Sequence, residues 1–277
     1  MCLIWRISVR TACRDVILRN VFGSVEEGLS ALGINSIELY LPRDLKVFSG
    51  HNLEYELSDF KNYLSEHNIE VNSILIANDF RETDYVVKAV NIASRLGVRV
   101  VRIDTIVKEI KGYSLEDYIR LSIEWLRELE GEVRDVALAV ENHGYISNRE
   151  DYLDALFREF PEAFLGLTLD TGNFYWYGYP LSKVYEVIEK FANRVKHTHV
   201  KNAVTECKEK WRKPGEVTMT PIYEGDVDLK RIVSILKKYG YHGDLTIEDE
   251  SLGRYNALGK KYILIRDTRY LNKLCRL

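Results

Sequence analysis

The sequence is short of the features that mark several protein classes. Its four cysteines are scattered and form no CxxC pair, which argues against a disulfide framework and against a zinc knuckle. No run of 18 apolar residues occurs, and the segment MCLIWRISVR lacks the basic leader and apolar core of a signal peptide. We therefore expect a soluble, cytoplasmic protein that has no membrane partner.

An excess of charge of either sign is also missing. The 277 residues carry 39 basic and 42 acidic side chains, so the formal net charge is -3. A chain with this balance has no general attraction to a phosphate backbone, and we expect no nucleic-acid partner. The phosphate-binding loops GxGxxG and GxxxxGK[ST] are absent as well, which disfavours a doubly wound nucleotide-binding sheet.

Segments with the apolar patterns of strands and helices alternate along the chain. The expected strands are residues 3–8, 36–40, 71–77, 98–103, 136–140, 165–169, 195–200 and 245–247. The expected helices are residues 25–32, 54–67, 82–96, 115–129, 151–160, 181–191 and 229–239, and a last helix from about residue 256. Eight strand–helix units predict an α/β fold, a single (β/α)8 TIM barrel domain with parallel strands that spans residues 1–277.

Four of the predicted strands end in a side chain that can bind a metal ion: Glu141, Asp170, His199 and Glu248. Alternate residues of a strand face opposite sides, so each of these side chains shares a face with small or polar residues. In a closed parallel barrel that narrow face points inward, and the carboxyl ends of the strands carry the chemistry. Two glutamates, an aspartate and a histidine suit one divalent cation, Mn²⁺, Mg²⁺, Co²⁺ or Zn²⁺. A salt bridge at a strand end is the alternative for any one of them alone.

Short motifs around these residues resemble the xylose isomerase-like TIM barrel family, in particular its sugar (phosphate) isomerase/epimerase branch. The motifs are NSIELYLP, VALAVENHG, LGLTLDTGNF, VKHTHVKNA, EGDVDLKRIVSILKKYGYHG and DLTIEDE. The resemblance implies one divalent metal ion bound by Glu141, Asp170, His199 and Glu248. It also implies an isomerase of carbohydrate metabolism that acts on a small-molecule sugar or sugar phosphate. The reaction would be proton transfer next to a carbonyl group, through an enediolate, with Glu141 and Glu248 as catalytic acid and base.

Five further residues are candidates for substrate binding: Glu38, Arg102, His143, Asn173 and Lys201. Glu38 and Arg102 lie near strand ends on the inward parity, and a structural ion pair is the alternative for each. His143 follows the strand that ends in a predicted metal ligand. Lys201 lies one layer above His199 on the same inward face, where its ammonium group could meet a hydroxyl or phosphate group.

Two positions depart from the family pattern. Asn173 stands where many epimerases of the branch carry a histidine, and Asn202 follows Lys201 where aspartate is common. Both changes bear on substrate identity rather than on the metal site.

Residues 202–228 show no regular pattern, and we expect an irregular lid or binding loop there. On the inward face below His199, we expect His197 to be a hydrogen-bonded core residue.

Two alternatives from other functional classes stay open. Endonuclease IV-like enzymes share the barrel and cut DNA at abasic sites with three metal ions. That branch expects a histidine where Asn173 stands and an Asp-x-His pair after the seventh strand, which the chain lacks between Lys201 and Glu224. A catalytically inactive sugar-binding barrel is the other alternative, and the presence of both glutamates speaks against it. The sequence leaves open whether the protein forms a homo-oligomer.

Overall fold

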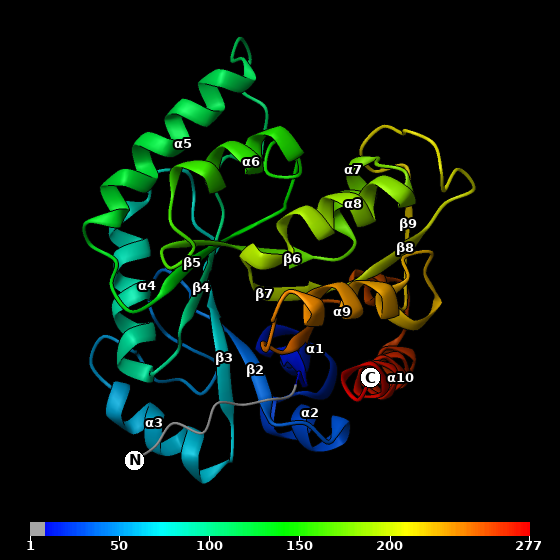
Figure 1. The fold of residues 1–277 in the computed structure, drawn as a ribbon. Coiled ribbons are helices and arrows are strands. Elements are labelled where there is room, and N and C mark those ends of the chain that lie inside the picture. Colours follow the sequence, from blue (N-terminus) through cyan, green and yellow to red (C-terminus); the bar gives the residue numbers. More distant parts are fainter. Residues whose placement is uncertain (1–8) are drawn as a thin grey trace.

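Eight parallel strands close into a barrel in this computed structural model, which describes residues 9–277 (Figure 1). The barrel strands are β1 (Thr11–Arg14), β2 (Ser36–Tyr40), β3 (Glu70–Leu75), β4 (Val100–Ile103), β5 (Ala137–Glu141), β6 (Leu165–Asp170), β7 (Val195–Val200) and β10 (Leu245–Ile247). Each strand pairs in parallel with the next barrel strand along the chain, and β1 pairs with both β2 and β10. The predicted (β/α)8 TIM barrel is therefore confirmed. The extent of the domain, residues 1–277, stays a prediction.

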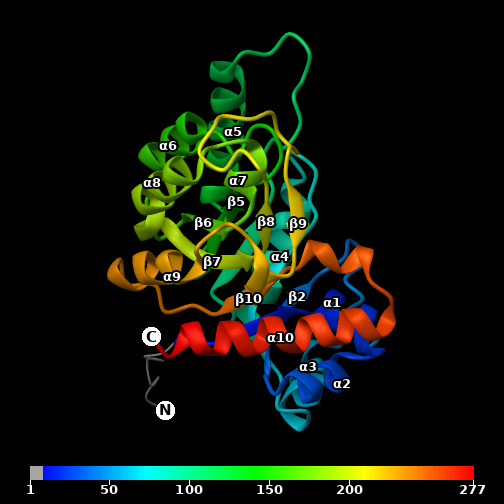
Figure 2. The ribbon, with the colours of Figure 1, turned by 90° about the vertical axis from the view of Figure 1, so that its right-hand side faces the viewer.

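Helices surround the barrel and cover the outer faces of its strands (Figure 1). They are α1 (Asp15–Phe22), α2 (Val25–Leu32), α3 (Leu57–Glu66), α4 (Thr83–Leu96), α5 (Leu115–Glu130), α6 (Glu150–Glu159), α7 (Asn173–Tyr177), α8 (Leu181–Phe191), α9 (Leu229–Lys238) and α10 (Ala257–Cys275). The last of them, α10, packs along α1, α2 and α9 (Figure 2). Within residues 9–277, no helix is both long enough and apolar enough to cross a membrane.

The two faces of the strands differ as the parity of the sequence predicts. In β5, Leu138 and Val140 are fully buried on the outer face, whereas Ala139 is buried on the inner one. Each large apolar side chain that is fully buried contributes roughly 1.5–3 kcal/mol to stability. Small inward residues leave the barrel interior free for longer polar side chains from the strand ends.

Two parts of the chain differ from what the sequence pattern suggested. The strand expected at residues 3–8 lies outside the described residues, and the strand that closes the barrel, Thr11–Arg14, was missed. The expectation of an irregular loop over residues 202–228 was wrong in part. β8 (Asn202–Val204) and β9 (Thr218–Thr220) form a two-stranded antiparallel sheet. The Asn202 side chain supports it, because its Nδ2 donates to the carbonyl oxygens of Ile222 and Val227, each at 3.1 Å.

Candidate metal centre

The structure brings together the four predicted metal ligands at the carboxyl ends of the barrel strands. Glu141, Asp170, His199 and Glu248 each offer one ligand atom, and these atoms lie within 4.8 Å of one another. Asp170 and His199 are register partners in β6 and β7, and Glu248 directly follows β10. The side chain of Glu248 is 13% exposed, and the other three are more deeply buried. The cluster therefore has one side that solvent and small molecules can reach.

Three buried atoms of this cluster make no hydrogen bond in the described part of the chain: Asp170 Oδ2, His199 Nδ1 and Glu248 Oε2. Their near neighbours are charged groups, since Lys201 Nζ lies 3.1 Å from Asp170 Oδ2 and His199 Nδ1 lies 3.0 Å from Glu248 Oε2. Buried polar atoms usually make hydrogen bonds, so atoms held only by such charge contacts are open to a cation. Carboxylate oxygens and an imidazole nitrogen are the donors that Zn²⁺ and Mn²⁺ accept in proteins. The residues therefore fit a divalent cation.

Glu141 is held by two of the substrate-binding candidates. Arg102 Nε donates to its Oε2 at 2.5 Å, and Asn173 Nδ2 donates to its Oε1 at 3.2 Å. Burial alone would raise the pKa of Glu141, but the positive charges of Arg102 and His199 outweigh it and hold that pKa well below its usual range. Glu141 is thus ionised at neutral pH, and Arg102 and Asn173 determine the orientation of its carboxylate.

Asp170 and Lys201 form a buried ion pair. Lys201 Nζ lies 3.1 Å from Asp170 Oδ2 and donates to Glu250 Oε1 at 2.5 Å. The backbone N–H groups of Gly172 and Asn173 donate to the other oxygen of Asp170, each at 2.8 Å. Burial raises the pKa of Asp170 to about 6, against the opposing effect of Lys201. The ammonium group therefore lies where a metal ion would also meet Asp170 Oδ2, rather than free in a cavity.

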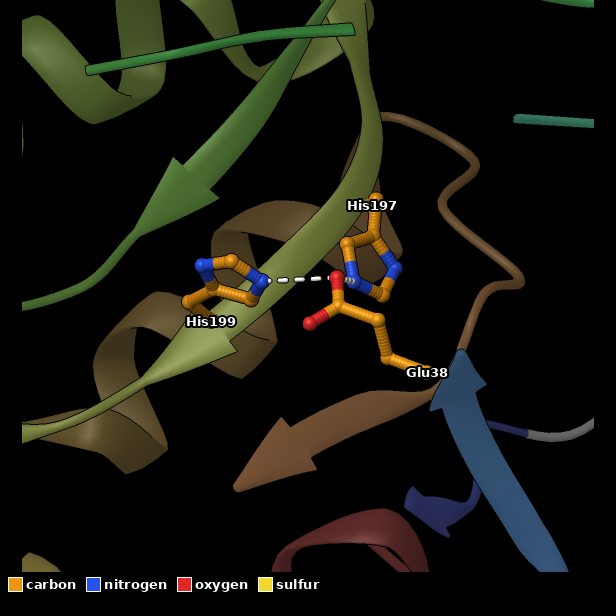
Figure 3. Close-up of side chains that lie close together, drawn as sticks. All are labelled: Glu38, His197 and His199. Atoms are coloured by element: carbon orange, nitrogen blue, oxygen red, sulfur yellow. Dashed lines mark hydrogen bonds and ion pairs between the residues drawn. The ribbon is translucent and has the colours of Figure 1, made fainter. Parts of the chain in front are cut away.

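Two histidines of β7 share one carboxylate of β2 (Figure 3). Glu38 Oε1 accepts from Nε2 of His197 and from Nε2 of His199, both at 2.8 Å. His197 also lies 3.1 Å from Ser73 Oγ, as expected for a hydrogen-bonded core residue. Burial would lower the pKa of His199, but Glu38 and Glu141 outweigh it and raise that pKa to about 9. Glu38, a candidate for substrate binding, is thus fully engaged below the metal cluster.

Sequence reasoning missed Arg14, which lies at the end of β1. Its Nε is 3.2 Å from Glu38 Oε2, and its Nη1 pairs with Glu248 Oε1. The sequence signal was weak, because β1 is only four residues long and begins with threonine and alanine. The signal that could have indicated Arg14 is its position between a short strand-like stretch and the helix α1 that follows it.

His143 is the most accessible of the predicted substrate-binding residues. Its side chain is 46% exposed, and its Nδ1 lies 3.1 Å from Asp104 Oδ1. The hydrogen bond to Asp104 raises the pKa of His143, against the lowering effect of burial. Asp104 also accepts from Arg102 Nη1 at 2.6 Å, and it lines a cavity of about 380 Å³ formed by the loops after β3 and β4. A chain of polar contacts thus connects the surface to Glu141.

Two basic residues of the segment after β7 are engaged within the protein. Arg212 Nη2 donates to the carbonyl oxygens of Tyr175 and Tyr179, at 3.0 and 2.9 Å, and Lys208 Nζ pairs with Asp226 at 2.6 Å. The Arg212 contacts tie the segment to α7 and to the residue Tyr179 that follows it, and the Lys208 pair joins two parts of the segment itself. They account for both side chains without a phosphate ligand.

Comparisons with known proteins match the chain to other TIM barrels. The sequence model described as xylose isomerase-like TIM barrel matches residues 27–271. An inosose dehydratase of Clostridium beijerinckii is 26% identical over 158 residues, which are 53% of this chain and only 52%, about half, of that relative. The structure of IOLI protein with a binding zinc atom has a TM-score of 0.72 at 16% identity, and the match covers 96% of this chain and 99% of that one. The structure of a D-tagatose 3-epimerase-like protein has a TM-score of 0.66 at 16% identity, with the same coverage of 96% and 99%.

Proposed function

Because this chain belongs to the xylose isomerase-like TIM barrel family, we propose that it is a sugar-modifying enzyme, a divalent-metal-dependent isomerase or epimerase of a sugar or sugar phosphate. The observation that carries the proposal is the convergence of buried ligand atoms from Asp170, His199 and Glu248, none of which makes a hydrogen bond among residues 9–277, beside the carboxylate of Glu141. The likeness to an inosose dehydratase and to an epimerase-like protein supports the substrate class.

We assign the metal-binding role to Glu141, Asp170, His199 and Glu248. A divalent cation bound there would supply positive charge against the negative charge that develops on the substrate oxygens. Oxygen ligands and one imidazole suit Mn²⁺, Mg²⁺, Co²⁺ or Zn²⁺, and the zinc bound in the IOLI structure supports this range.

The two glutamates would act as acid and base. Glu248 Oε2 has no hydrogen bond among residues 9–277 and belongs to the most exposed of the four side chains, so it can accept a proton from the carbon beside a carbonyl group. Loss of that proton leaves an enediolate. Glu141, oriented by Arg102 and Asn173, would return a proton on the opposite face in an epimerase or at the neighbouring carbon in an isomerase.

The remaining candidates would orient the substrate or the ligands. His143 is exposed and is hydrogen-bonded to Asp104, so we assign it to a substrate hydroxyl group. Lys201 is bound to Asp170 and Glu250, and we assign it to balancing the charge of Asp170 while no cation is present.

Solvent deuterium exchange tests the acid–base assignment. With Mn²⁺ present, the wild-type protein should incorporate deuterium into one member of a panel of keto-sugars and their phosphates, followed by NMR. Glu141→Gln and Glu248→Gln should fold normally and lose exchange by about 10²–10⁴-fold. Glu162→Gln, which changes an exposed glutamate paired with Lys196, is the control and should exchange like the wild type. Undiminished exchange in either active-site variant refutes its assignment.

A dehydratase is a second candidate, because the curated relative is an inosose dehydratase. Dehydration would begin with the same proton removal and continue with loss of a hydroxyl group from the next carbon. Mass spectrometry separates the two reactions, since a dehydratase gives a product lighter by one water and an isomerase gives a product of unchanged mass.

Metal content addresses the nuclease alternative: about one ion per chain favours the sugar enzyme, and about three favour an endonuclease IV-like site.

A further inference from the structure

The Glu38 side chain is almost fully buried, and its charged neighbours are His197, His199 and Arg14. Its side chain is 1% exposed, and those of His197 and His199 are 3% and 0% exposed. Burying an ionised carboxylate costs several kcal/mol unless its hydrogen bonds and charge are matched. Here the matching groups are two imidazoles, at 2.8 Å each, and the Arg14 guanidinium, whose Nε lies 3.2 Å from Glu38 Oε2.

The contact with Glu38 decides which nitrogen of His199 faces the proposed metal site. An imidazole that donates a hydrogen bond through Nε2 turns its other nitrogen, Nδ1, to the opposite side. In His199 that nitrogen lies 3.0 Å from Glu248 Oε2 and 3.4 Å from Glu141 Oε2. The ring of His197 packs edge-on against the ring of His199, with centroids 5.3 Å apart and planes at 84°, which opposes rotation of His199 (Figure 3).

We propose that Glu38 is a positioning residue that, with His197, holds His199 so that Nδ1 binds the divalent cation. The inference rests on the proposed function, because it takes His199 as a metal ligand. Carboxylates that accept from the second nitrogen of a metal-bound histidine fix the ring and increase its basicity, and their loss typically costs 10–100-fold in metal affinity. Arg14 extends the arrangement, since it contacts both Glu38 and Glu248 and so joins two walls of the site.

A second cation among Glu38, His197 and His199 fits the distances less well. Two ligands of a tetrahedral zinc ion, each about 2.0–2.2 Å from the metal, lie about 3.3 Å apart. The observed 2.8 Å between each Nε2 and Glu38 Oε1 is the length of a hydrogen bond. Nε2 of His199 cannot hold a proton and a metal ion together, so the hydrogen bond and a second cation exclude each other.

Metal affinity and NMR test this role in the full chain. Mn²⁺ or Zn²⁺ alone is titrated calorimetrically into the wild type, Glu38→Gln and Asp244→Asn. Asp244 is the matched control. It is a buried carboxylate that pairs with Arg10, and it directly precedes β10, at the opposite end of the barrel from the metal ligands. We expect Glu38→Gln to lower metal affinity 10–100-fold and Asp244→Asn to leave it within about twofold. In the ¹⁵N-histidine spectrum of the zinc-loaded wild type, we expect His199 to bind zinc through Nδ1 and to keep a proton on Nε2.

Each contrary outcome identifies what has failed. A wild type that binds no metal overturns the proposed function and this inference together. A wild type that binds one ion, with Glu38→Gln binding as tightly as the control, overturns only the role of Glu38. Two ions per chain, one of them lost in Glu38→Gln, overturn it in favour of a second cation site. If Glu38→Gln does not fold, the wild-type spectrum decides, because zinc bound through Nε2 of His199 contradicts the inference.

Discussion

Replacing Asp15 by asparagine should stabilise the protein more above neutral pH than in mild acid. Asp15 is the first residue of α1 and is 0% exposed. Its Oδ1 accepts from the Tyr40 N–H at 3.0 Å, but its Oδ2 has no hydrogen bond to any described residue and lies 3.7 Å from Arg19. Burial raises the pKa of Asp15 from 3.8 to about 6, against the opposing Tyr40 N–H and Arg19.

The direction and size of the effect follow from that shift. A carboxyl group whose folded-state pKa is raised stabilises the fold fully below its unfolded pKa, and this contribution is lost as the pH rises through about 6. At 1.36 kcal/mol per pKa unit, the wild type loses about 2 kcal/mol from this group between about pH 4.5 and pH 8. Asparagine does not titrate and keeps an oxygen for the Tyr40 N–H.

Urea denaturation at the two pH values measures the difference. The free energy of unfolding of Asp15→Asn, relative to the wild type, should increase by about 2 kcal/mol between about pH 4.5 and pH 8, or about 4–8 °C in Tm. A pH-independent offset cancels in this comparison, and the ion pair with Arg19, which requires an ionised Asp15, is already included in the pKa of that group. The control is Asp59→Asn, which removes an exposed aspartate from the first turn of α3. A relative stability of Asp15→Asn that does not change with pH, or that changes no more than the control, refutes the reasoning.

Three other substitutions probe the site and the core. Lys201→Met removes the ammonium group that competes for Asp170 Oδ2, so saturating Mn²⁺ should raise Tm more in this variant than in the wild type; an equal or smaller rise contradicts the assignment. Trp125→Ala empties a fully buried position and should lower the free energy of unfolding by about 3–5 kcal/mol in urea denaturation, whereas a loss below about 1 kcal/mol means that the core is looser than described. Gly178→Ala adds a Cβ 2.1 Å from the carbonyl oxygen of Arg212, at a residue whose φ is 111°. We therefore expect a lower Tm and faster proteolysis of residues 208–216. Unchanged proteolysis speaks against the close contact.

Much of the barrel could be predicted because its elements have strong local patterns. The predicted ranges 25–32, 36–40, 181–191 and 195–200 are the observed bounds of α2, β2, α8 and β7. Gly33 and Gly97 end α2 and α4 in the left-handed conformation that glycine adopts without strain. In each case the information lies within a dozen neighbouring residues.

Three short strands, β1, β8 and β9, escaped prediction, whereas the equally short β10 lies within the alternating run from Asp244 to Glu248 and was predicted. β1 has four residues and β8 and β9 have three each, too few for alternation to stand out from the surrounding sequence. β1 is a strand because it pairs with Ile37 of β2 and with residues 245–247 of β10, which are distant in the sequence.

The sequence by itself determined that the chain forms a barrel, and that Glu141, Asp170, His199 and Glu248 lie at the carboxyl ends of its strands. Both follow from strand parity and from the order of strands and helices, which can be read along the chain. Only the tertiary structure decided that Nδ1 of His199 faces this cluster and that Arg14 contacts Glu248. Glu38 and His199 are 161 residues apart, and Arg14 and Glu248 are 234 apart. Contacts over such separations exist only once the barrel has closed and each side chain has settled against neighbours that no local pattern specifies.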